Sequence, residues 1–262
     1  MNKQQRAMEK ELMRLYKQER AFLEKRTEKK DSALNRLLAE KVPEKLQATL
    51  DAAFAKAFAL VFEKGTAVIE KSCSKEEKEK QFQIDSYAAE IKGDRRSLRA
   101  ISRKAGGAGR LNLALSGAAG IGLGLLGVGL PDIALFTALM LRGIYEIALR
   151  YGFSYESETE RQFILLLISG AVAYGEELKA IDEELNGFIQ SGAFPAPDMD
   201  ALIRQAAGGL SKELLVMKFL QGVPVVGAVG GAYDAVYMRR IMACAELKYR
   251  RRFYYNKMKE IK

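Results

Sequence analysis

The side chains that could carry out chemistry are few in this chain, because it contains no histidine. Histidine is the side chain that most often serves as a base at neutral pH and as a metal ligand. Ser72 and Lys75 stand three residues apart, a spacing at which a lysine could activate a serine nucleophile. The companion motifs of that chemistry are absent from the sequence, so this spacing alone does not predict a catalytic site.

Cys244 is the second candidate nucleophile. Arg239, Arg240 and Lys248 lie within a few residues of it, and such cations can lower the pKa of a thiol. Its immediate neighbours are small apolar residues, which favours a packing role for this cysteine on a helix. Cys73 is far away in the sequence, and the chain opens without an apolar signal region, so we expect two free thiols in a reducing cytoplasm.

Two further patterns could bind a cofactor or a metal. Gly122, Gly124 and Gly127 have the GxGxxG spacing of a dinucleotide site, but no buried strand precedes them and no parallel-sheet pattern occurs. Adjacent acids such as Glu176 and Glu177 fall on amphipathic helix surfaces, with no histidine to complete a metal site. We therefore predict no catalytic residue, no cofactor and no metal.

A run of about twenty uncharged residues, 111–130, is long enough to cross a bilayer. Gly120 and Gly124 have the GxxxG spacing of closely packed helices, and Gly227 and Gly231 repeat it. Glycine and alanine, however, contribute little to membrane insertion. The two Gly-rich segments are therefore predicted to form apolar helical hairpins that either enter lipid or pack against each other in a soluble core.

Basic residues border the run on both sides. Those before it are Arg95, Arg96, Arg99, Arg103, Lys104 and Arg110, and those after it are Arg142 and Arg150. Because basic flanks stay on the cytoplasmic side of a membrane, a hairpin that dips into one leaflet satisfies these charges better than a full crossing.

The helix after the run carries charges within an apolar pattern. Arg142 stands four residues before Glu146, which places the two side chains on one helix face. We expect them to form a buried charge network, with Asp132 and Asp234 as further members.

The last part of the chain is basic and aromatic. From Arg239 onward it contains nine lysines and arginines and two glutamates, a mixture with aromatic rings that suits the headgroup layer of an anionic membrane. The alternative is a solvated helix end whose cations complement the helix dipole. No nucleic-acid-binding motif is present, so we do not expect nucleic acid as a partner. The tail residues predicted to contact lipid are Arg250, Arg251, Arg252, Phe253, Tyr254 and Tyr255.

The apolar residues recur with the period of helices, and no strand alternation or hairpin turn signature occurs. We predict an all-α fold with a charged amphipathic N-terminal helix in residues 1–30 and a single multi-helix domain in residues 31–262. The N-terminal helix is also a candidate surface for self-association.

Local signals mark where several helices begin and end. Ser74 with Glu77 and Ser157 with Glu160 have capping-box spacing at helix starts. Gly152 is placed to end a helix in the left-handed conformation.

Three segments resemble the EcsC protein family: LNRLLAEKVPEKLQATLDAAFAKAF, GLPDIALFTALMLRGIYEIALRYG and KFLQGVPVVGAVGGAYDAVYMRRI. The similarity covers residues 32–255. The resemblance implies a bacterial protein of a kind named for an operon that also encodes an ABC exporter, with a connection to secretion and the cell membrane. It implies no reaction, cofactor or catalytic residue.

These observations lead to three hypotheses of function. The first is a non-enzymatic accessory protein, peripheral to or partly inserted in the inner face of the cell membrane, with anionic phospholipid and ABC transporter components as partners. The second is a soluble lipid carrier or sensor. The third is an enzyme that acts on a lipid or envelope substrate, in which Asp132 or Asp234 would open onto a pocket.

Overall fold

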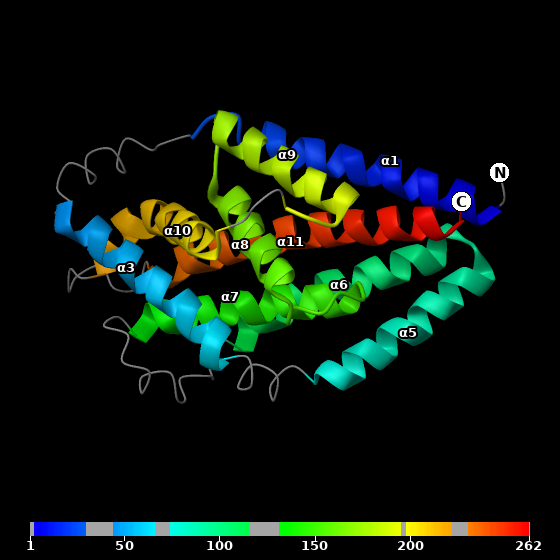
Figure 1. The fold of residues 1–262 in the computed structure, drawn as a ribbon, viewed down its shortest axis with the longest axis horizontal. Helices are drawn as coiled ribbons and strands as arrows, with labels where there is room; N and C mark the ends of the chain where they lie inside the picture. The colour runs from blue at the N-terminus through cyan, green and yellow to red at the C-terminus, as the bar shows by residue number, and fades with distance from the viewer. Residues whose placement is uncertain are drawn as a thin grey trace.

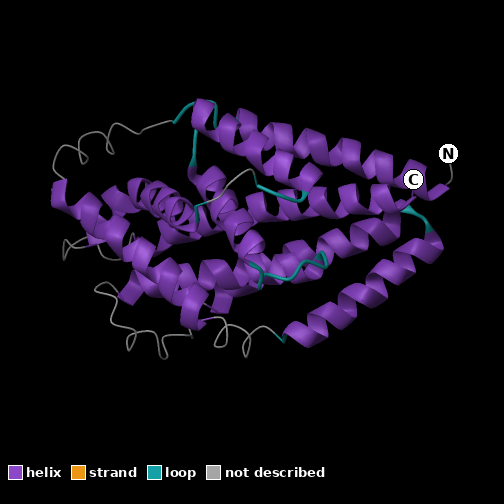
Figure 2. Cartoon of the chain, viewed as in Figure 1, coloured by secondary structure: helices purple, strands orange, loops and turns teal. Residues whose placement is uncertain are grey.

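The computed structural model describes residues 3–29, 44–65, 74–115, 131–194, 198–221 and 230–261, and every regular element in these ranges is a helix (Figures 1 and 2). The α-helices are α1 (Lys3–Glu24), α3 (Glu44–Leu60), α5 (Lys75–Lys92), α6 (Arg95–Leu115), α7 (Pro131–Arg150), α8 (Glu158–Val172), α9 (Gly175–Ser191), α10 (Met199–Gln221) and α11 (Gly230–Ile261). A π-helical turn, Val61–Gly65, follows α3. The predicted all-α fold is confirmed. The central residues of both Gly-rich segments lie outside the described ranges.

Helix α11 is the element around which the others are arranged. It is 32 residues long and packs against α1, α6, α7, α8, α9 and α10. Figure 1 shows α1 and α9 along one side of it and α6 and α7 along the other. Because neighbours surround α11, its apolar residues are not confined to one stripe. Ile241, Ala245, Tyr249 and Phe253 form one buried stripe at four-residue spacing, and Met242, Cys244 and Tyr254 are buried beside it.

Helix α8 is the most buried element. Every residue from Gln162 to Val172 is buried. Its segment QFILLLISGAV has apolar side chains on all faces, which is typical of a helix enclosed by others. Phe163 of α8 lies 4.9 Å from the Phe188 ring of α9 and 5.4 Å from the Tyr249 ring of α11, centroid to centroid. Aromatic packing therefore joins three helices at the centre.

The N-terminal helix belongs to the same core. Met8 and Leu15, two members of its apolar stripe, are each 1% exposed. The helix packs against α11 and α6, so this stripe is used within the chain. Self-association through α1 stays a prediction, and the buried stripe is not the surface that would support it.

The helix ends confirm two of the three local signals. The Ser157 side chain accepts a hydrogen bond from the backbone N–H of Glu160 at 3.2 Å, as a capping box requires. The capping bond predicted at Ser74 is wrong. Ser74 precedes α5, but its backbone is left-handed (φ 46°) and its side chain makes no capping bond. An N-cap residue normally has extended backbone angles, which bring its hydroxyl to the free N–H groups.

Gly152 ends α7 in the left-handed conformation, at φ +81°. A Cβ atom at this position would lie 2.2 Å from the Phe82 ring of α5. Glycine is therefore required twice, by the backbone angle and by the close approach of α5.

We expect Gly152→Ala to lower the free energy of unfolding by about 2–4 kcal/mol, from left-handed strain and overpacking together. Gly187→Ala is the matched control, because that glycine lies inside α9 and a Cβ atom there would meet no heavy atom within 4 Å. The control is expected to be neutral or to stabilise by about 1 kcal/mol. Urea unfolding followed by circular dichroism measures both, and equal values would contradict the requirement at residue 152.

Candidate anion-binding groove

The tail arginine Arg252 is held inside the protein. Its guanidinium donates to the Glu160 carboxylate of α8 at 2.7 Å and lies 4.2 Å from the centre of the Phe153 ring. Tyr249 donates to the other oxygen of the same carboxylate, also at 2.7 Å. Glu160 is 4% exposed, so the pair satisfies a buried charge.

The neighbouring cations of α11 are held in the same way. Arg251 donates to Glu19 of α1 at 2.7 Å. Lys248, 3% exposed, lies 2.6 Å from an Asp182 oxygen of α9 and donates to Asn186 at 2.9 Å. Charge pairs thus tie α1 and α9 to α11.

The aromatic tail residues lie in the core. Phe253 is 4% exposed and Tyr254 2%, and Tyr255 is half-buried against the same core. The Tyr254 hydroxyl lies 3.4 Å from that of Ser102 on α6. The rings of Phe253 and Tyr254 are turned into the protein, because Phe253 lies 6.0 Å from the Phe82 ring of α5, centroid to centroid, and Tyr254 lies against α6. Contact of these tail residues with lipid stays a prediction.

The predicted pair of Arg142 and Glu146 is present, with a closest approach of 3.4 Å. Lys78 of α5 joins it, 3.3 Å from the same carboxylate oxygen. The side chains of Asp132 and Asp234 lie outside the described part of the structure. So do Gly120, Gly124 and Gly227, whereas Gly231 lies in the first turn of α11.

The weak catalytic signals gain no support. Lys75 pairs with Glu156 at 2.5 Å, and Ser72 lies outside the described residues. Glu176 and Glu177, the adjacent acids, are both exposed in the first turn of α9. Across the described ranges, no group of three or more acids and cysteines could hold a metal ion.

A large groove lies between α1, α6 and α11, with a volume of about 1140 Å³. Its walls carry seven arginines and two glutamates: Arg14, Arg95, Arg96, Arg99, Arg103, Arg239, Arg250, Glu11 and Glu246. Ser102, Ile147, Met242 and Ala243 complete the lining. The groove is therefore strongly basic at its walls and apolar over part of its floor.

The carboxylate of Glu11 is an anion that groove arginines already contact. Its carboxylate is 4% exposed and lies 2.6 Å from Nε of Arg95 and 2.9 Å from Nη2 of Arg99. Burial alone would raise the pKa of Glu11, but hydrogen bonds and the charges of Arg99 and Arg95 hold that pKa below its ordinary value. The groove already binds one carboxylate as an internal ligand.

Three other arginines leave their charge open to the groove. Arg96 and Arg103 of α6 and Arg239 of α11 are exposed, and none makes an ion pair within the described residues. Arginine binds phosphate and carboxylate oxygens with a planar fork of donors. The arrangement can thus bind an anion from two walls.

Sequence reasoning found only part of this groove. Arg95, Arg96, Arg99 and Arg103 were predicted as a flank of the apolar run, and their spacing already places several on one helix face. Only the tertiary fold brings Arg239, more than one hundred residues later, to the opposite wall. No local signal links the two segments.

Comparison with protein-family models shows to which family the chain belongs. The model of the EcsC protein family matches residues 6–253, which is nearly the whole sequence. The chain belongs to the EcsC protein family. No curated protein and no solved structure matches it. Among the helices described for this EcsC protein, none is both long enough and apolar enough to cross a membrane.

Cys244 in this EcsC protein is a packing residue. It is 3% exposed, and burial raises the pKa of its thiol to about 12 in spite of the nearby Lys248. Two of the three cations expected to activate it, Arg240 and Lys248, are instead paired with acids on other helices.

We expect iodoacetamide at pH 8.5 to leave Cys244 unmodified in the native protein and to modify it in denaturant, because the thiolate form is scarce and enclosed. Peptide mapping by mass spectrometry separates Cys244 from Cys73. Modification of native Cys244 at the rate of a small thiol would show that the site is reactive.

We expect Arg252→Gln to lower the free energy of unfolding by about 2–4 kcal/mol, because it leaves the Glu160 carboxylate buried without its cation. Arg239→Gln, which removes an exposed arginine of the same helix, is expected to change it by less than about 0.5 kcal/mol. Urea titrations of the two variants measure the difference. Equal stabilities would mean that the Arg252 pair is not structural.

Proposed function

We propose that this EcsC protein is a non-enzymatic, peripheral membrane protein that binds anionic phospholipid surfaces through the arginine groove. The supporting observation is the surplus of seven arginines over two glutamates at one groove. The chain as a whole carries a net charge of +9, which favours approach to an anionic surface. Each basic residue near such a surface contributes about 1 kcal/mol of binding free energy.

The open arginines are the part of the groove that supplies this attraction. Charges already paired inside the protein, such as those of Arg251 and Arg252, have their field largely cancelled by a nearby acid. The charges of Arg96, Arg103 and Arg239 are not cancelled by an acid within the described residues. This proposal moves the membrane contact from the C-terminal end of α11 to the groove.

The cytoplasmic face of the cell membrane is the surface we propose, because it presents anionic lipid to polybasic proteins. A role as an accessory to an ABC transport or secretion system is what the family resemblance implies, and it is proposed here on that basis alone.

We expect the triple variant Arg96→Gln, Arg103→Gln, Arg239→Gln to bind anionic vesicles at least about tenfold more weakly than the wild type at low ionic strength. Co-sedimentation with vesicles of phosphatidylglycerol and phosphatidylcholine across a salt series measures this. Binding should also fall with added salt, because the contact is electrostatic.

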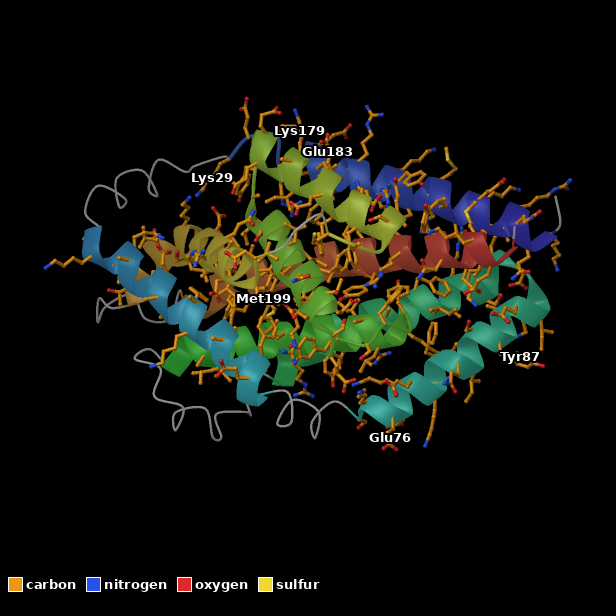
Figure 3. All side chains as sticks on the ribbon, viewed as in Figure 1. Lys29, Glu76, Tyr87, Lys179, Glu183 and Met199 are labelled. Carbon is orange, nitrogen blue, oxygen red and sulfur yellow. The ribbon has the colours of Figure 1, made fainter. Side chains whose placement is uncertain are left out.

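The matched control removes three positive charges elsewhere, by Lys179→Gln, Arg204→Gln and Lys212→Gln. These residues are exposed on α9 and α10, and Figure 3 shows Lys179 on the outer side of α9. The control is expected to bind within about twofold of the wild type. Equal loss in both triples would show that net charge, not the groove, drives binding. No binding of the wild type would overturn the proposal.

A further inference from the structure

We propose that the groove between α1, α6 and α11 binds one individual phospholipid molecule, with its phosphate between the open arginines of α6 and α11 and its glycerol and first acyl carbons on the apolar floor. This inference rests on the proposed membrane association and names the ligand of the same groove. A surface that only attracts a bilayer needs no such cavity.

The charge distribution places the phosphate. The arginines nearest Glu11 are partly neutralised, because its carboxylate lies within hydrogen-bond distance of both Arg95 and Arg99. The open charge is therefore left at Arg96 and Arg103 on one wall and Arg239 on the other. A phosphodiester is the anion that this arrangement suits, because arginine forks can bind its two non-bridging oxygens.

The floor distinguishes an amphiphile from a small free anion. Ile147 and Met242 reach the groove from α7 and α11, and Ala243 adds an exposed methyl group beside them. Inorganic phosphate would gain nothing from these contacts. An acyl chain gains about 0.8 kcal/mol for each methylene group that it removes from water.

The dimensions agree with a ligand of this size. Arg239 and Arg250, which both line the groove, stand eleven residues apart on α11, about 16 Å along the helix axis. The volume of about 1140 Å³ exceeds the range usual for drug-sized ligands. A headgroup, a glycerol and the beginning of two acyl chains fit this space.

Nucleic acid is disfavoured as the occupant. The thirteen residues that line the groove in the described structure include no aromatic side chain, so unpaired bases would have no stacking platform. An acidic peptide remains a competitor for the arginines, and the experiment includes it.

The test is isothermal titration of the full-length protein with dihexanoyl phosphatidylglycerol, kept below its micelle concentration. We expect saturable binding of one lipid per chain. Dihexanoyl phosphatidylcholine and glycerol 3-phosphate should each bind at least about tenfold more weakly, the first for its cationic choline and the second for its missing chains. A short polyglutamate peptide should not displace the bound lipid.

Two variants locate the site. The triple change Arg96→Gln, Arg103→Gln, Arg239→Gln should weaken lipid binding at least about tenfold, while Lys179→Gln, Arg204→Gln, Lys212→Gln leaves it within about twofold. Glu11→Gln should tighten binding severalfold, since it removes the internal anion that competes for Arg95 and Arg99. Circular dichroism establishes that each variant is folded.

Four results would overturn the inference: non-saturable binding, equal affinity for phosphatidylcholine, equal affinity for glycerol 3-phosphate, or displacement by the peptide. These outcomes are separable from failure of the proposed function. Vesicle binding without binding of the dispersed lipid would leave the membrane association standing and remove the lipid site. Binding of the dispersed lipid without vesicle binding would leave the lipid site standing and remove the membrane association.

Discussion

Burial of cations on α11 is the constraint on which the rest of the structure depends. A charged side chain removed from water costs several kcal/mol unless a partner compensates it. Lys248, Arg251 and Arg252 all come from this helix, and acids from α9, α1 and α8 meet them. Arg240 likewise lies 3.4 Å from Glu213 of α10. Because each acid sits on a different helix, these pairs specify how four helices align with α11.

The groove follows from the same arrangement. The acids that face the buried side of α11 are paired with cations of that helix. The side of α11 that faces the groove carries Arg239 and Arg250, and the arginines of α6 lie on the opposite wall. Glu11 is the acid that α1 supplies there, and it pairs with Arg95, Arg99 and, at 3.9 Å, Arg14 of its own helix. The groove is thus left with seven arginines and two glutamates, a surplus of five positive charges at one place.

The helical character of the chain and the caps at Ser157 and Gly152 could be predicted from sequence, because periodicity and capping are local. The Ser74 cap could not, because the spacing of Ser74 and Glu77 does not reveal that the backbone of Ser74 is left-handed, and a capping bond needs extended backbone angles. The tail illustrates a deeper limit. A basic and aromatic helix end has one composition whether it faces lipid or a core, and only the positions of Glu19 and Glu160 decide between them. The Arg142–Glu146 pair could be predicted because both residues lie on one helix. The groove could not, because segments that are distant in the sequence form it.

The position of α11 after the helices that it contacts has a consequence for synthesis on the ribosome. The helices that carry Glu19, Glu160 and Asp182 emerge before α11, so the cations that neutralise these acids are translated after them. A partly made chain therefore cannot bury these carboxylates without cost, and α1, α6, α7, α8, α9 and α10 lack the helix that they all contact. Completion of the core waits for α11, so the helices that precede it stay exposed to chaperones and proteases until α11 has been made.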